Sequence, residues 1–238
     1  MESQLLTKAK QDIPLYFNDF KVFWDSTTKQ YTDKELTVCY GVTVIFKNWL
    51  LCLNHVGVKN LDGILKEIHE DINASFFHSY FGHYRSAHMH LRSVIELSLQ
   101  LLYFFQHEVE YQQWRDAEFR IKHEELTAYL KKHPRFKNSS TANLISDVTN
   151  NWKKFSKHIH GETPNYFQST LVSAKTKQIS KTDFEIWKSN FKKTGYQINK
   201  LFLLFFQKHI NLFPTQSREI LLFNMKKKDL EELGFETN

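Results

Sequence analysis

Residues 82–105 read GHYRSAHMHLRSVIELSLQLLYFF, and this stretch decides the fold. Its apolar residues recur at helical spacing, which predicts a long helix packed on most of its sides. One narrow stripe of this helix is charged, with members at spacings of three, four and four: Arg85, His88, Arg92 and Glu96. The stripe continues on the same helical face into Leu99 and Tyr103, so it should contact other protein as well as water.

The charged stripe has two interpretations, because charges on a largely apolar helix must be paired, hydrogen-bonded or kept beside a wet cleft. In the first, Arg92 and Glu96 form a structural ion pair within a helical bundle. In the second, the stripe forms a polar site between helices. Both interpretations predict that Arg92 and Glu96, at i, i+4 spacing, pair with each other and are at least partly shielded from water.

The composition of the 238-residue chain favours long helices. It contains only 7 Gly and 4 Pro, which is few for a protein rich in tight turns. The apolar content of 41% is ordinary for a globular protein, whereas 21 Phe is a high count. We therefore expect an all-α multi-helix bundle with roughly 60% helix or more and no extended sheet.

Charge and cysteine usage bear on partners and location. A net charge of +6 allows nucleic acid as a partner without requiring it. Cys39 and Cys52 lie in one apolar helical segment, about 19 Å apart along its axis, so we expect two buried free thiols. The polar start MESQLLTKAK lacks a signal pattern, and the longest apolar run, residues 201–206, is too short for a membrane span. We expect a cytoplasmic protein with no membrane partner.

Helical spacing and the residues that begin or end helices predict the order of elements. The expected helices cover residues 3–25, 32–55, 60–73, 82–105, 108–132, 141–158 and 183–211, with a loop over 164–181 and a short helix near the end. A capping box, Thr32 to Glu35, opens the second helix, and residues 75–82 either continue the third helix or interrupt it. We expect a single all-α domain, with amino-terminal helices over 1–58, the bundle over 59–213 and a carboxy-terminal tail over 214–238.

A second polar cluster lies at residues 153–161, which read KKFSKHIHG. On a helix His158 falls one turn after Lys154, and His160 one turn after Ser156. Ammonium groups here could bind phosphate, and an imidazole could move a proton during RNA cleavage. The alternative is a solvated basic helix end that suits the helix dipole. The chain has no Gly-rich phosphate loop, paired CxxC, HExxH or GxSxG motif, and we expect no metal and no cofactor.

The order of these features resembles HEPN-like helical proteins of bacteria, whose nucleotide-binding domain is widespread in prokaryotes and higher eukaryotes. Three blocks over about residues 80–162 carry the resemblance: Tyr84 to Phe104, Trp114 in a charged helix, and Phe155 to Gly161. It implies RNA binding, metal-independent endoribonuclease activity, a homodimer or a protein partner, and a role as a toxin or in antiviral defence.

The hallmark of that family is an arginine, four to six further residues, and then a histidine. The position at this distance before His160 holds Lys154, which lacks the planar fork of arginine. A formal match also runs from Arg85 to His90, but five helical positions separate these side chains by about 140°.

Two hypotheses follow. In the first, His160 is the general acid or base with His158 in reserve, and Glu96 orients Arg92. Phosphate is then held by Arg92 and by further basic side chains: Lys154, Lys153, Lys157, Arg85 and His88. The second is a non-catalytic helical interaction subunit of a larger defence complex, whose aromatic surface docks a partner. A solvent-reachable cleft shared by Arg92, Glu96 and His160 would favour the first hypothesis.

Overall fold

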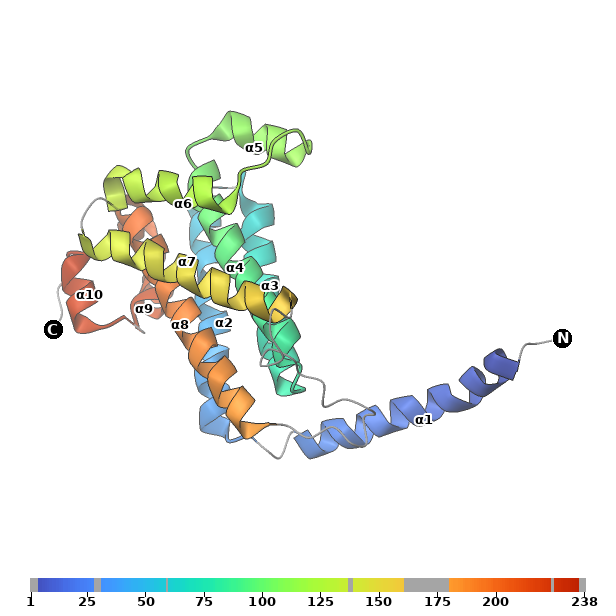
Figure 1. Ribbon diagram of the computed structural model, residues 1–238. Coiled ribbons are helices and arrows are strands. Elements are labelled where there is room, and N and C mark those ends of the chain that lie inside the picture. The colour runs from blue at the N-terminus through green and yellow to red at the C-terminus, as the bar shows by residue number, and fades with distance from the viewer. Residues whose placement is uncertain are drawn as a thin grey trace.

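The computed structural model describes residues 4–27, 31–58, 60–136, 139–160, 180–223 and 225–235. Helices make up about 85% of these residues, which contain no strand, so the expected all-α multi-helix bundle is confirmed (Figure 1). The α-helices are Gln4–Thr27 (α1), Asp33–His55 (α2), Asp62–Tyr80 (α3), Tyr84–Phe104 (α4), Glu108–Arg115 (α5), His123–Lys132 (α6), Ser139–His160 (α7), Lys181–Phe205 (α8), Thr215–Phe223 (α9) and Lys227–Glu232 (α10). Short 3-10 helices cover Pro134–Phe136 (η1) and Gln207–Leu212 (η4). The loop expected over 164–181 lies, up to residue 179, outside the described residues.

Helix α4, which carries the charged stripe, lies at the centre of the bundle. It packs against α3, α6, α7 and α8, and Figure 1 shows α7 crossing both α4 and α8. The apolar side chains of α4 are buried among these neighbours, as at Leu91, Leu99 and Leu102. The core therefore surrounds the helix that carries the charged stripe.

Helix α2 packs against α3, α8 and α9. Its start confirms the expected capping box: the Thr32 hydroxyl accepts from the Glu35 amide, and the Glu35 carboxylate accepts from the Thr32 amide. Helix α8 comes close to α2 at Gly195, where a side chain would overlap Val42. In the described part of the chain, α2 alone has the length and hydropathy of a membrane span, and half of that window is buried within the bundle.

The prediction of a single charged helix over residues 108–132 is wrong. The chain forms α5 and α6, separated by an irregular segment in which Ala117 has a left-handed φ of 61°. The amides of Glu118 and Phe119 both donate to the carbonyl of Gln113, which ends α5. This turn brings Trp114 and Phe119 to the same ring of Phe104, with centroids 5.4 and 6.4 Å away. The break between α5 and α6 therefore lets both Trp114 and Phe119 pack on Phe104.

Other boundaries also differ from expectation. Helix α3 continues to Tyr80, so residues 75–80 extend it rather than interrupt it. Helix α8 ends at Phe205, earlier than expected, and the chain tightens into η4 before Pro214. The tail forms α9 and α10 rather than one short helix. Cys39 and Cys52 are buried free thiols as expected, and burial raises the pKa of each to about 11.

Helix α1 projects from the bundle and contacts it near its carboxy-terminal end (Figure 1). There Trp24 packs on Phe81 with ring centroids 4.5 Å apart. Several large apolar side chains along α1 are exposed: Leu6, Ile13, Leu15, Phe17 and Val22. The helix therefore presents an apolar surface that the described bundle does not cover.

Candidate functional site

The charged stripe of α4 faces α7, and the two helices meet through polar contacts. The Arg85 guanidinium donates to the carbonyl of Ile159 at 2.5 Å. About two turns further along α4, Arg92 Nε donates to Ser156 Oγ at 3.0 Å. The expectation that this stripe contacts other protein is confirmed, and α7 supplies that protein from residues more than 60 positions away.

Arg92 and Glu96 form the expected pair, with Nη2 and Oε2 3.4 Å apart. Trp152 organises both of them: its indole N–H donates to Glu96 Oε2 at 3.3 Å, and its ring lies 4.7 Å from the guanidinium carbon. The side chains of Arg92 and Glu96 remain 29% and 35% exposed. The pair is therefore fixed by α7 and still reachable from solvent.

His123, at the start of α6, is a candidate that the sequence analysis missed. Its ring stacks on Trp152 with centroids 3.9 Å apart and planes inclined by 7°. Both ring nitrogens are buried without a hydrogen-bond partner among the described residues. Burial lowers the pKa of His123, although the nearby Glu96 carboxylate acts in the opposite direction. No local pattern in the sequence distinguishes this histidine, because its contact with Trp152 depends on how α6 packs on α7.

A second polar network occupies the side of α7 that faces α8. His88 is 1% exposed, and its Nδ1 lies 2.7 Å from the carbonyl of Tyr84, an acceptor that requires the proton on Nδ1. His88 Nε2 then accepts from the side-chain amide of Asn190 at 3.0 Å. Asn190 Oδ1 accepts in turn from Lys154 Nζ at 3.1 Å. This network fixes His88 as a neutral imidazole.

His158 stacks on His88, with ring centroids 4.3 Å apart and planes inclined by 2°. Burial, together with the neighbouring His158, lowers the pKa of His88 to about 3. Burial and the positive charges of Lys154 and Arg85 also lower the pKa of His158. Two neutral stacked rings inside the bundle are suited to packing, so the structure gives His88 no exposed phosphate contact and His158 no ready proton to donate.

The remaining candidates of α7 are exposed: Lys153, Lys154, Lys157 and His160. Helix α7 is continuous through Ser139–His160, so the six positions from Lys154 to His160 separate these side chains by about 120°. His160 instead shares the flank of Ser156, one turn before it, while Lys154 faces Asn190 on α8. Helical geometry therefore puts His160 about 40° around α7 from Ser156, the partner of Arg92, and on a different face from Lys154.

The Arg85 to His90 pattern is divided between two faces of α4. Arg85 contacts α7, whereas His90 faces α3, where its Nδ1 lies 2.7 Å from the Asp71 carboxylate. His78 stacks on His90 with centroids 5.2 Å apart. The divergence expected from helix geometry is confirmed.

Comparison of the chain with protein-family models, with curated proteins and with solved structures finds no match in any of the three. Among the described residues, no group of three or more His, Cys, Asp or Glu is arranged to hold a metal ion. The roles of the candidate residues therefore depend on the geometry described above.

We expect Glu96→Ala to lower the free energy of unfolding by about 1 kcal/mol. A fully buried pair would lose roughly 3–5 kcal/mol, but this pair is about one-third exposed and solvent screens it. Part of the loss comes from the Trp152 indole N–H, which would lose its acceptor. Urea denaturation measures this change, and Glu70→Ala, at an exposed acidic position of α3, serves as the control. A Glu96→Ala variant as stable as the wild-type protein would contradict the pairing.

Proposed function

We propose that the protein is a HEPN-like RNA-binding protein that cleaves RNA without a metal, in the cytoplasm of a bacterium, as a toxin or defence effector. One observation carries the proposal: the exposed His160 lies one helical turn after Ser156, the residue of α7 that binds the solvent-reachable Arg92. Phosphate binding and proton transfer require a guanidinium and an accessible imidazole, and the two helices supply one of each. The family resemblance of Tyr84 to Phe104 and of Phe155 to Gly161 supports the same proposal.

Arg92 is held in place for this role. Nε is engaged by Ser156 and Nη2 by Glu96, so the Nη1 hydrogens are left without a partner among the described residues. Those hydrogens would contact a phosphate oxygen, while Trp152 and Glu96 prevent the guanidinium from rotating. Preorganised donors of this kind stabilise charge that develops on phosphate during the reaction.

His160 would transfer the proton. It is the last residue of α7 and is exposed, in contrast to His158 and His88, which are buried and neutral. A general acid or base needs access to the ribose hydroxyl or to the leaving oxygen, and only an exposed ring has that access. Attack by the 2′-hydroxyl needs a base and a cation on the phosphate, and Arg92 supplies the cation.

We expect His160→Ala to reduce cleavage of a labelled RNA by about 10²- to 10⁴-fold, the usual loss when a general acid or base is removed. His55→Ala is the matched control, because His55 is also the exposed last residue of a helix. Cleavage by the wild-type protein should continue in EDTA. Circular dichroism of both variants shows whether the helical fold is retained.

RNA binding provides the second part of this test. Lys154→Ala should weaken binding in a salt-dependent manner if the lysine contacts phosphate from the α8 side, and Lys154→Arg should retain binding. If the wild-type protein neither binds nor cleaves RNA, with any protein partner added, the proposal is wrong. The alternative hypothesis, a non-catalytic interaction subunit, would then replace it. The exposed apolar residues of α1 support that alternative.

A further inference from the structure

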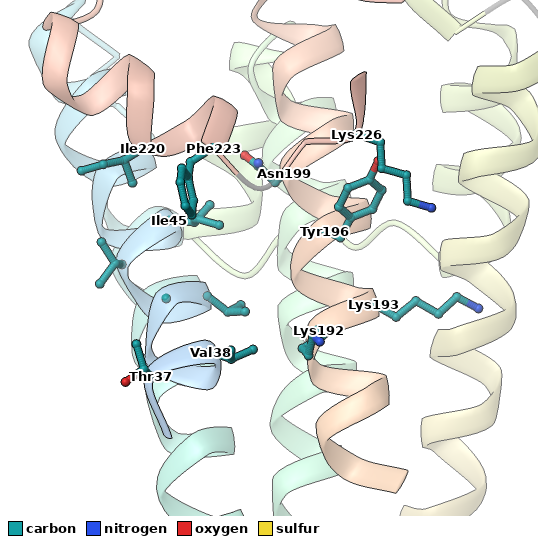
Figure 2. A pocket seen from close by; sticks show the side chains of 13 residues that line it. Thr37, Val38, Ile45, Lys192, Lys193, Tyr196, Asn199, Ile220, Phe223 and Lys226 are labelled. Atoms are coloured by element: carbon teal, nitrogen blue, oxygen red, sulfur yellow. The ribbon is translucent and has the colours of Figure 1, made fainter. Parts of the chain in front are cut away.

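A groove between α2 and α8 lies apart from the α4–α7 contact. It has a volume of about 690 Å³, within the range of roughly 300–1,000 Å³ that is usual for small-molecule sites. Figure 2 shows Val38 and Ile45 of α2 across the groove from Lys192 and Tyr196 of α8. Ile220 and Phe223 of α9 lie at one end. None of the candidate residues discussed above lines this groove.

The α2 side of the groove is apolar and open. Val38, Val42, Val44 and Ile45 form this side, and Gly41 lies among them without a side chain. A Cβ atom at Gly41 would have nothing within 4 Å, so the groove passes directly over the helix backbone there. At the end formed by α9, the ring of Phe223 is 86% exposed. An apolar chain lying in the groove would cover these surfaces, which water covers otherwise.

The described residues that line the α8 side of the groove include lysines and no carboxylate. Lys192 and Lys193 line it together with Lys226, which lies over the Tyr196 ring, and no Asp or Glu is among the lining residues. Figure 2 shows Lys192 and Lys193 leaving adjacent positions of α8 in different directions, with the Lys193 side chain directed away from α2. Lysine side chains at the edge of an apolar surface match a ligand that has an anionic head and an apolar body.

The other lysines of α8 differ from these in having acidic partners. Lys188 pairs with Glu35 at 3.3 Å and also with Glu185, and Lys200 pairs with Asp229 at 2.6 Å. Lys192 and Lys193 lie between them in the sequence and have no acidic partner among the described residues. The protein therefore neutralises α8 on both sides of the groove and leaves the groove itself cationic.

The neutral polar side chains that α8 contributes to the groove are already engaged. Asn199 Oδ1 accepts from the Trp49 indole at 2.7 Å, and Asn199 Nδ2 donates to the carbonyl of Leu221 at 2.8 Å. The Tyr196 hydroxyl donates to Asp229. Recognition of a ligand head is therefore left chiefly to the lysines, which favours an anion over a neutral polar molecule.

We propose that the α2–α8 groove binds a single-chain amphipathic anion, with an acyl chain along α2 and a carboxylate or phosphate head at Lys192 and Lys193. This inference is independent of the proposed RNA chemistry, because the two sites share no residue. The ligand is a dissolved acyl anion that enters the groove from solution. The test must distinguish this binding from attachment of the protein to a membrane surface.

Isothermal titration with dodecanoate, below the concentration at which it forms micelles, tests the proposal on the full chain. We expect saturable binding of dodecanoate and none of dodecyltrimethylammonium, which has the same chain and a cationic head. Binding should weaken as salt is added, because exposed lysines contact the head. Equal binding of both amphiphiles, or no binding of dodecanoate, would overturn the proposal. Attachment to anionic phospholipid vesicles without binding of the monomeric acid would also overturn it.

Gly41→Leu tests whether the acyl chain lies in the groove. The new side chain meets no protein atom at its Cβ and fills the groove, and it replaces glycine with a better helix former, so the fold should be retained. We expect a dissociation constant at least about tenfold larger. Gly63→Leu is the matched control, since a Cβ at Gly63 of α3 also has nothing within 4 Å and Gly63 lies outside the groove. Equal affinity of the two variants would place the ligand elsewhere.

Lys192→Gln combined with Lys193→Gln tests the site of the head. We expect weaker dodecanoate binding, by about tenfold, and a smaller dependence on salt. Lys47→Gln combined with Lys131→Gln removes the same charge from exposed positions outside the groove and should leave binding unchanged. Equal weakening by both pairs would show an effect of net charge alone and would overturn the assignment of the head to the groove.

Discussion

Trp49→Ala should lower the free energy of unfolding by about 3–5 kcal/mol, the range for removal of a large buried aromatic side chain. Trp49 has no exposed surface, and its ring meets Phe202, Phe206 and Phe213 at centroid distances of 5.3 to 5.9 Å. The substitution leaves a cavity between α2 and α8 and also removes the donor to Asn199. Urea denaturation monitored by circular dichroism measures the loss.

Two further variants divide this effect into its parts. Trp49→Phe retains most of the ring but leaves Asn199 Oδ1 buried without its donor, and we expect a loss of about 1–3 kcal/mol. Trp24→Ala removes the same side chain from a position on α1 that is 45% exposed, and its cost should be clearly smaller. If Trp24→Ala and Trp49→Ala destabilise the protein equally, α2 is not held in the bundle as described.

Acid should destabilise the protein steeply below about pH 6.5, and His88 should account for much of the slope. The pKa of this buried histidine is about 3 in the folded state, against a usual value of 6.5. Between these two pH values the unfolded chain binds a proton that the folded chain does not, so stability falls as the pH falls. The slope from one such group approaches about 1.4 kcal/mol per pH unit. His158 acts in the same direction, because its pKa is also lowered.

His88→Gln measures the contribution of this ring. Glutamine retains an acceptor that can face the Asn190 amide but does not titrate, so the dependence of unfolding free energy on pH should flatten between about pH 6.5 and 4. His55→Gln, at an exposed position, should leave the dependence unchanged. Parallel curves for the wild-type protein and His88→Gln would mean that His88 binds its proton equally well in the folded and unfolded states. The His88–His158 stack would then become a candidate for proton transfer.

The sequence alone determined features that depend on residues within about one helical turn of each other. Apolar spacing predicted α4 and α2 with nearly correct ends, and the Thr32–Glu35 capping box formed as expected. The Arg92–Glu96 pair and the divergence of Arg85 from His90 also follow from helical period. Such contacts are fixed as soon as the backbone is helical, because 3.6 residues per turn then set the neighbours.

Tertiary structure alone decided which of the candidate side chains meet. His88 and His158 stack across 70 positions of sequence, and Asn190, which no pattern singled out, links His88 to Lys154. The break between α5 and α6, and the partners of His123, also depend on packing between distant segments. These contacts are set by the angle and rotation at which whole helices pack. Those quantities result from the fit of many side chains at once, and no short stretch of the sequence contains them.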